Sequence, residues 1–241
     1  MKWFESWFDT SYYHALYQHR NEGEAAKFVD TLISYLQLKS GERVADIACG
    51  KGRHSAQLAA HGLAVWGMDL SENSIAKAND LQVGGAVFQV HDMRETFPQQ
   101  GFKAVFNLFT SFGYFDDPAD DLKVLINMCA ACAPGGYVVQ DYLNAASVIG
   151  SLPQSAECSL GGYDFKTKKY RTENHIVKDI WVRDGDADLA FQEQVRIFSQ
   201  PELAELHQLA GLGIVGFFGD YALGNFDDKM SPRIVVISKK S

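Results

Sequence analysis

The sequence lacks the features that mark secreted and membrane proteins. No apolar run approaches the ~18 residues that a helix needs to cross a bilayer. The opening segment MKWFESWFD carries Glu5 and Asp9 and has no long apolar stretch, so it does not match a signal peptide. Four cysteines in 241 residues form no secretory disulfide framework. These absences predict a cytoplasmic protein without membrane contact.

A metal or redox site is not expected either. Cys129 and Cys132 form a CxxC pair, but neither a second such pair nor a histidine pair accompanies them. Their segment, LKVLINMCAACAPGG, is predicted to be helical, and small apolar side chains pack well on a helix face. We therefore interpret both cysteines as packing residues.

Positive charge is also scarce. The formal net charge is −8 at pH 7, and an acidic surface repels phosphate backbones, which argues against nucleic acid as the main partner. The chain is 46% hydrophobic, which allows it to bury a full core. With no internal repeat and no low-complexity linker, residues 1–241 are predicted to form a single domain.

What the sequence does contain is a regular alternation of helices and strands. Residues 1–38 are predicted to form a helical cap, because aromatic residues recur there at three- and four-residue spacing. Ser71 and Asp117 stand where helix N-caps are expected, and Pro134 begins a turn predicted to lead into the fifth strand. The apolar runs between helices favour a parallel sheet covered on both faces. They are RVADIAC, LAVWGMDL, AVFQVHD, KAVFNLFTS and GYVVQDYL.

The pattern changes over residues 149–199. The segments YDFKTKKYRT, NHIVKDIWV and LAFQEQVRIFS are typical of strands with mixed alternation, and RDGDAD is typical of a hairpin turn. We predict an antiparallel β insertion here. A helix, PELAELHQLAG, and two strands, GIVGFFGDY and RIVVISKK, are predicted to follow it.

A short glycine turn follows the first strand, in ADIACGKGRHS. Gly50 and Gly52 allow the backbone to approach a ligand closely. The dinucleotide fingerprint needs Gly or Ala at the sixth position, where this chain has Ser55, and the spacing of a phosphate-binding P-loop is absent around Lys51. Asp46, just before the turn, would repel a pyrophosphate but suits a ligand with a cationic amine. The turn therefore favours a ligand without phosphate.

Two further carboxylates end the next two strands. Asp69 lies about 20 residues past the turn, where an acidic side chain can accept both hydroxyls of a ribose. Ser71 already serves as the predicted helix cap, which leaves Asp69 available for a ligand. Asp92 can accept from the exocyclic amine of adenine, and Met93 can pack on the ring. A glycine turn, a ribose acceptor and an adenine acceptor together fit S-adenosylmethionine.

The sequence here resembles the class I S-adenosylmethionine-dependent methyltransferases. The resemblance rests on VADIACGKGRHS, GMDLSENSIAKA, HDMRE, AVFNLFTSFGYF and APGGYVVQDYLN, in the order typical of that family. DMRE, FTSFGYF and the late RIFSQPELAELHQLAGLGIVGFFGDY are similar to the branch that acts on small molecules, such as TDP-amino-sugar N,N-dimethyltransferases and glycine N-methyltransferases. The family implies a Rossmann-like α/β fold with seven strands in the order 3-2-1-4-5-7-6, the last one antiparallel.

The resemblance also implies the cofactor contacts. N-terminal helices in such enzymes fold over the cofactor, which points to Tyr13 and Arg20. Arg20 would pair either with the methionine carboxylate or, on the surface, with Glu24. Lys51 departs from the family, which has a small polar residue between the glycines. The other implied contacts are Asp46, Ala48, Gly50, Gly52, Asp69, Leu70, Asp92, Met93, Leu108 and Phe109.

Methyl transfer is an in-line displacement, so the protein mainly aligns the reactants and excludes water. The catalytic candidates stand at the ends of strands four and five: Tyr114, Asp141 and Tyr142. The acceptor is expected to be a small molecule with an amine or hydroxyl. The β insertion would cover the acceptor or form a dimer contact, so a monomer and a homodimer both stay open. Its basic run KTKKYR is either solvated or meets an acidic substrate such as a sugar nucleotide phosphate.

Two alternatives belong to other classes. A nicotinamide-dependent oxidoreductase on a related fold would use Asp69 in the same way, but the chain offers no clear Tyr-x-x-x-Lys motif. A binding module without catalysis would keep the cofactor pocket or only its fold. NLFT after the fourth strand lacks the N/D-P-P-Y/F motif of enzymes that methylate base amino groups, which disfavours nucleic acid as the acceptor.

Overall fold

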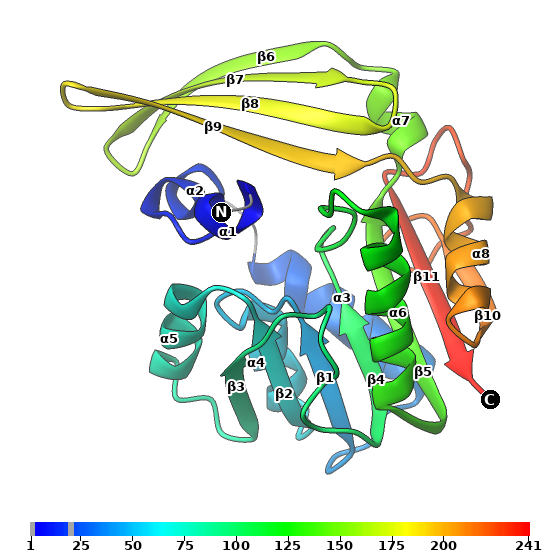
Figure 1. Ribbon diagram of the computed structural model, residues 1–241. Coiled ribbons are helices and arrows are strands. Elements are labelled where there is room, and N and C mark those ends of the chain that lie inside the picture. Colours follow the sequence, from blue (N-terminus) through cyan, green and yellow to red (C-terminus); the bar gives the residue numbers. More distant parts are fainter. Residues whose placement is uncertain (1–2, 19–21) are drawn as a thin grey trace.

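A seven-stranded mixed sheet forms the centre of the molecule in the computed structural model, which describes residues 3–18 and 22–241 (Figure 1). Its strand order is β10-β11-β5-β4-β1-β2-β3. The strands are β1 (Arg43–Ile47), β2 (Ala64–Asp69), β3 (Ala86–Val90), β4 (Phe102–Asn107), β5 (Cys132–Leu143), β10 (Leu212–Phe218) and β11 (Arg233–Lys240). Counted within this sheet alone, the order is 3-2-1-4-5-7-6, which confirms the predicted fold.

The first five strands pair in parallel, and β11 runs antiparallel to both β5 and β10. Successive residues of β1 face opposite sides of the sheet. Val44 packs in one apolar cluster with Leu58 and Phe106, whereas Ala45 packs in another with Val124 and Met128. Burial on both faces explains why these strands are nearly continuous apolar runs.

Helices cover both faces of this sheet (Figure 1). Ser71 caps α5 by accepting from the N–H of Ser74, and Asp117 caps α6 by accepting from the N–H of Ala119, as predicted. The helices are α1 (Trp3–Trp7), α2 (Ser11–Leu16), α3 (Glu22–Leu36), α4 (Arg53–Ala60), α5 (Glu72–Asp80), α6 (Pro118–Ala131), α7 (Ala145–Ile149) and α8 (Gln200–Leu209). None of them, within residues 3–18 and 22–241, is both long and apolar enough to span a membrane.

The start of β5 differs from the prediction. The strand begins at Cys132, directly after α6, so the Pro-Gly-Gly segment lies inside it and not before it. The pairing with β4 shifts there, from Phe102 opposite Cys132 to Ala104 opposite Tyr137. A bulge of this kind inserts extra residues without ending the strand.

A second, four-stranded antiparallel sheet lies above the first, in the order β6-β7-β8-β9 (Figure 1). Its strands are β6 (Gln154–Leu160), β7 (Tyr163–Arg171), β8 (His175–Asp184) and β9 (Ala187–Arg196). The sequence pattern indicated β7, β8 and β9 but missed β6. This edge strand is exposed along almost its whole length, so it carries no alternation of apolar and polar residues.

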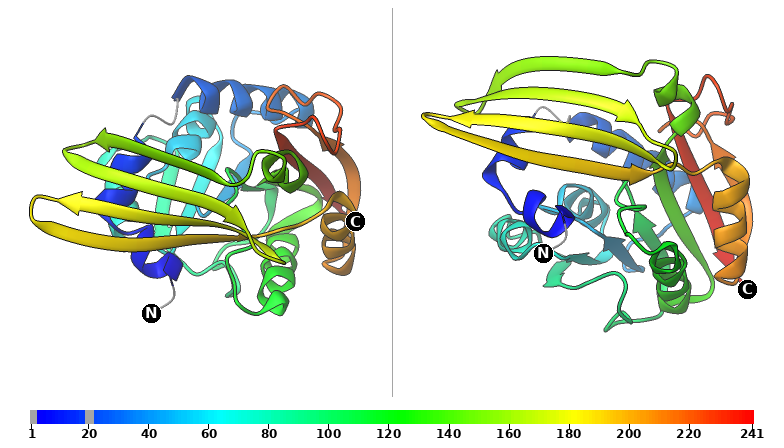
Figure 2. Two further views of the ribbon diagram at one scale, coloured as in Figure 1. Left: turned by 90° about the horizontal axis from the view of Figure 1, so that it is seen from above. Right: turned by 45° about the horizontal axis from the view of Figure 1, so that its top comes forward.

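The helices α1 and α2 lie between the two sheets (Figures 1 and 2). They contact the antiparallel sheet through aromatic side chains. The ring centroids of Trp7 and Phe191 are 4.7 Å apart, and the indole N–H of Trp7 donates to Glu193 at 2.7 Å. The N-terminal segment therefore closes one side of the space between the sheets.

Candidate functional site

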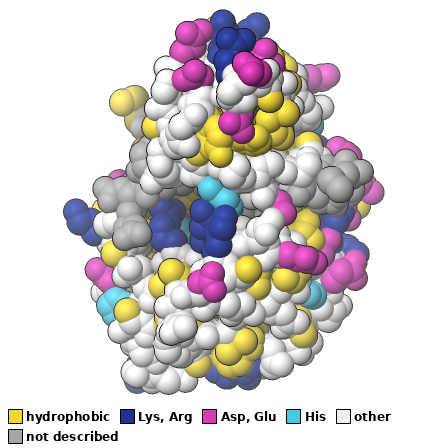
Figure 3. Space-filling view, turned by 90° about the vertical axis from the view of Figure 1, so that its left-hand side faces the viewer, with side chains coloured by type: hydrophobic (Ala, Val, Ile, Leu, Met, Phe, Trp, Pro, Cys, Tyr) yellow, Lys and Arg dark blue, Asp and Glu magenta, His cyan; other side chains and the backbone are white. Residues whose placement is uncertain are grey.

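A cavity of about 1380 Å³ lies where the carboxyl ends of β1–β4 meet α1, α2 and the antiparallel sheet. Ligands of open α/β sheets bind outside the carboxyl ends of the strands. Figure 3 shows Lys, Arg and His side chains gathered between the upper sheet and the body below it. Basic and acidic residues both line the cavity: Lys51, Arg53, Lys169, Lys178 and Arg233 with Asp9, Asp69, Glu72, Asp92 and Glu193.

The glycine turn after β1 forms part of the cavity wall. Ala48 and Gly50 line the cavity, and both have positive φ angles, of 58° and 57°. A Cβ atom at Gly50 would meet nothing within 4 Å, so this turn leaves open space for a ligand. A non-glycine residue such as Ala48 in this conformation is strained, and such residues cluster at ligand sites.

Asp46 and Gly52 lie behind this wall and not in it. Asp46 is 1% exposed and accepts from the hydroxyl of Ser55 at 2.6 Å, and burial raises the pKa of its carboxyl to about 7. A Cβ atom at Gly52 would lie 2.8 Å from the ring of Phe88. The expected direct contacts are corrected accordingly: Gly52 allows close packing against Phe88, and Asp46 binds the first turn of α4 through Ser55.

Asp69, at the end of β2, has both carboxylate oxygens bound to backbone amides. Oδ2 accepts from the N–H of Gly50 at 2.8 Å, and Oδ1 accepts from the N–H of Ser71 at 2.9 Å. Burial raises the pKa of this carboxyl, and these hydrogen bonds oppose that rise. The side chain lines the cavity. The Gly50 N–H already donates to Asp69, so it is not available to bind a phosphate.

A contact that the sequence did not indicate holds the cap against this strand end. Asp9 accepts from the hydroxyl of Ser71, and from the side-chain amide of Asn73 at 2.7 Å. Asp9 lines the cavity beside Asp69. Since 62 residues separate Asp9 from Ser71, no local sequence signal could reveal this pairing.

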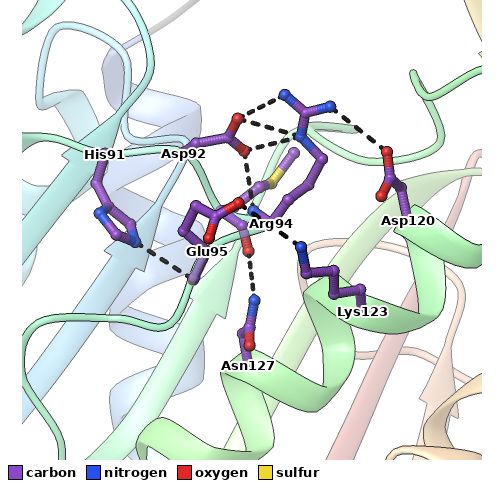
Figure 4. A network of polar contacts seen from close by, with 8 residues as sticks. His91, Asp92, Arg94, Glu95, Asp120, Lys123 and Asn127 are labelled. Carbon is purple, nitrogen blue, oxygen red and sulfur yellow. Dashed lines mark hydrogen bonds and ion pairs between the residues drawn. The ribbon is translucent and has the colours of Figure 1, made fainter.

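The end of β3 carries a short ion-pair network (Figure 4). Arg94 donates to both oxygens of Asp92 and reaches Asp120 at 3.4 Å. Burial opposes ionisation of Asp92, but the Arg94 guanidinium outweighs it and lowers the pKa of that carboxyl. Asp92 and Met93 both line the cavity. Asp92 is thus held as an ionised hydrogen-bond acceptor in the cavity wall, and its contact with adenine stays a prediction.

The end of β4 is strained and firmly held. Phe109 and Thr110 have φ angles of 64° and 63°, unusual for residues with side chains. The N–H of Phe109 donates to Oδ2 of Asp141 at 2.8 Å, and the N–H of Thr110 donates to the Asp141 carbonyl at 2.9 Å. Leu108, Phe109 and Thr110 all line the cavity.

The three catalytic candidates occupy different places. Tyr114 lines the cavity, and its hydroxyl donates to the carbonyl of Thr110. Asp141 is fully buried and binds Arg233, whose Nε donates to Oδ1 at 2.8 Å. Tyr142 is also fully buried, and its hydroxyl donates to the carbonyl of Arg196 at 2.7 Å. The expectation that Asp141 and Tyr142 touch the acceptor is therefore corrected, since neither reaches the cavity.

This geometry predicts a small effect for Tyr142→Phe. The substitution removes one buried hydrogen bond, which costs about 1 kcal/mol of folding free energy. We expect turnover within about twofold of the unmodified protein, because the hydroxyl does not face the cavity. Denaturant unfolding and steady-state kinetics check this; a loss of turnover above tenfold in a folded variant would restore a catalytic role.

Two other expected contacts come from the cap and from the residue that follows β2. Tyr13 lines the cavity and packs edge-on against Phe8, with ring centroids 4.9 Å apart. Leu70 lines the cavity and is 38% exposed, which suits an apolar contact to a ring. Arg20 lies outside the described residues, so its pairing stays a prediction.

Strand ends that combine a glycine turn with two carboxylates define a Rossmann-like site for a nucleoside ligand. A family model described as a methyltransferase domain matches residues 17–215. The chain belongs to this methyltransferase family. This finding favours methyl transfer over the nicotinamide-dependent alternative.

Individual relatives agree with the family. The ubiquinone biosynthesis O-methyltransferase of Bordetella bronchiseptica is 36% identical over 110 residues, which cover 44% of this chain and 44% of that enzyme. The match thus spans less than half of that relative's length. The structure of the CcbJ methyltransferase from Streptomyces caelestis has a TM-score of 0.81 at 18% identity, covering 98% of this chain and 99% of that one.

An amino pentose methyltransferase from Micromonospora echinaspora, solved with S-adenosylmethionine bound, has a TM-score of 0.72 at 20% identity. The alignment covers 96% of this chain and 98% of that one. At these identities, both structures show a shared fold and do not identify the acceptor of this chain.

Proposed function

We propose that this protein is an S-adenosylmethionine-dependent methyltransferase that acts on a small-molecule amine or hydroxyl. The observation that carries the proposal is the half-buried Asp69 carboxylate, fixed by two backbone amides in the wall of a large cavity. The family match supports methyl transfer as the reaction. The proposal includes a single-domain chain working in the cytoplasm, as a monomer or homodimer.

The residues present fit the proposed cofactor. The Asp69 oxygens keep free lone pairs for the two ribose hydroxyls, since a carboxylate offers about four acceptor positions. Asp92 can accept from the adenine amine, with Met93 and Leu70 as apolar contacts for the ring. The open space at Gly50 leaves room for the methionine portion.

The bound cofactor would supply an electrophilic methyl group. The chain's own residues would hold the reactants in line and keep water away, which is the main contribution that a protein makes to such a displacement. Phe109 and Tyr114 would form the wall next to the transferred group. Asp141 acts through the loop that it holds, as a positioning residue and not as a base.

The acceptor would occupy the part of the cavity under the antiparallel sheet. A volume of about 1380 Å³ exceeds the roughly 300–1,000 Å³ of common ligand sites, so it has room for the cofactor and a second small molecule. Lining residues from β6–β9 include Gln154, Thr167, Ile176 and Val195. The strands β6–β9 would thus cover the acceptor, and we call their cavity-lining face the roof of the site.

Thermal unfolding with S-adenosylhomocysteine tests the proposal. A ligand at a hundred times its Kd stabilises the folded state by about 2.7 kcal/mol, which shifts the Tm of a chain of this size by roughly 5–10 °C. NADH under the same conditions should give no shift. Stabilisation by NADH alone would support the oxidoreductase instead. Stabilisation by S-adenosylhomocysteine without methylation of any compound in a broad metabolite screen would favour the binding module.

A further inference from the structure

One row of polar side chains crosses the inner face of the antiparallel sheet. Lys169 of β7 lies opposite Gln154 of β6 on one side and opposite Lys178 of β8 on the other. Lys178 in turn lies opposite Glu193 of β9. All four side chains line the cavity. The register therefore places two lysines next to each other in the roof of the site.

The neighbours of this row on β8 and β9 are apolar, whereas on β7 they are Thr167 and Arg171. On one side the same face carries Ile180 and Phe191, and on the other it carries Ile176 and Val195. Like charges directly opposite each other on neighbouring strands destabilise a sheet. The repulsion within this lysine pair therefore opposes folding, which points to a function in binding.

The partners of these residues leave Lys169 available. Glu193 accepts from the indole of Trp7 and from the hydroxyl of Tyr17, and Lys178 donates to the same Tyr17 hydroxyl at 2.9 Å. Lys169 makes no hydrogen bond or ion pair with any residue in the described part of the chain. It is half-buried, and burial together with Lys178 lowers the pKa of its ammonium group, an effect that the Glu193 carboxylate opposes only in part. An anionic ligand would stabilise the charged form of such a partly desolvated lysine.

The alternation of β7 separates this lysine from its neighbours in sequence. Lys166 and Lys168 belong to the same basic run, but both are exposed and neither lines the cavity. Lys166 pairs with Glu157 at 3.1 Å on the outer surface. The run KTKKYR thus combines a solvated outer face with an inner face that includes Lys169 and Thr167.

We propose that Lys169 and Lys178, with Gln154 beside them, form a subsite for an anionic oxygen group on the methyl acceptor, either a carboxylate or a phosphate. The proposal rests on the proposed function, because it assigns the roof of the cavity to the acceptor. Lysine binds such groups as a point charge with three donors, and the Gln154 amide can add a further donor. The acceptor would be an amine or hydroxyl compound carrying this group near the atom that is methylated.

Anion binding to the protein saturated with S-adenosylhomocysteine tests the subsite. Inorganic phosphate and acetate are titrated by calorimetry against sodium chloride at equal ionic strength. We expect saturable binding of one of the two anions beyond the chloride baseline, and the stronger anion identifies the group. Lys169→Met should weaken that binding about tenfold or more, as expected for loss of a hydrogen bond to a charged group. Lys169→Arg should retain it.

Lys168→Met is the matched control, because it removes the same charge from the outer face of the same strand. It should leave anion binding unchanged. Equal responses to phosphate, acetate and chloride, or unchanged binding in Lys169→Met, would overturn the subsite. A loss of S-adenosylhomocysteine affinity confined to Lys169→Met would assign the lysine to the cofactor and overturn it too. Failure of the unmodified protein to bind S-adenosylhomocysteine would instead overturn the proposed function.

Discussion

Asp69→Ala is expected to weaken S-adenosylhomocysteine binding by tenfold to a hundredfold. The proposed ribose contacts go to a charged acceptor, and we expect their loss to cost about 1.5–3 kcal/mol in total, as for one hydrogen bond to a charged group, because water can replace part of the contact. The substitution also frees the amides of Gly50 and Ser71, which Asp69 holds at 2.8 and 2.9 Å. Calorimetric titration of the variant measures the loss.

Asp80→Ala is the control for this experiment. Asp80 is exposed on α5, the helix that follows Asp69, so its removal changes the charge near the site without touching the cavity. We expect its affinity to equal that of the unmodified protein. If Asp69→Ala binds as tightly as this control while remaining folded, the ribose assignment is wrong.

Asp141→Ala is expected to lower folding stability more than any other single change considered. The Nε of Arg233 lies 2.8 Å from Oδ1 of Asp141, so the substitution removes the carboxylate that balances this guanidinium, and breaking a buried ion pair costs about 3–5 kcal/mol. For a chain of this size that corresponds to roughly 6–20 °C in Tm. Since Asp141 also binds the Phe109 amide, the strained loop after β4 should loosen and turnover should fall.

A surface ion pair provides the comparison. Arg183 and Asp188 pair at 2.9 Å on the exposed side of the antiparallel sheet, where solvent screens the charges. Asp188→Ala should leave the Tm almost unchanged, as measured by calorimetric unfolding. Similar shifts for Asp141→Ala and Asp188→Ala would show that the buried pair does not hold the β4 loop.

The sequence reveals much of this site because its key residues lie at strand ends. The apolar runs mark the strands, and a parallel sheet brings their carboxyl ends to one edge. Asp69 and Asp92 could therefore be placed from position alone. Asp141 and Tyr142 could not, because they lie in a strand that is buried on both sides. There the residue type gives no sign of which side chain reaches a cavity.

Other parts of the site depend on contacts between distant segments. The bond between Asp9 and Ser71 joins the cap to β2, and no periodicity encodes it. The row that includes Lys169 and Lys178 depends on hairpin register, which the mixed alternation of these strands leaves open. The bond between Asp92 and Arg94 is local and was missed although the sequence carries a readable signal for it, since an arginine two residues after a carboxylate can pair with it.

A crystal structure of the protein with S-adenosylhomocysteine tests the central claim most directly. We expect both ribose hydroxyls within hydrogen-bond distance of the Asp69 carboxylate, the adenine beside Asp92 and Met93, and the sulfur facing the space under the antiparallel sheet. A ligand bound elsewhere, or an Asp69 side chain turned away from the ribose, would contradict the assignment of this cavity as a methyltransferase active site.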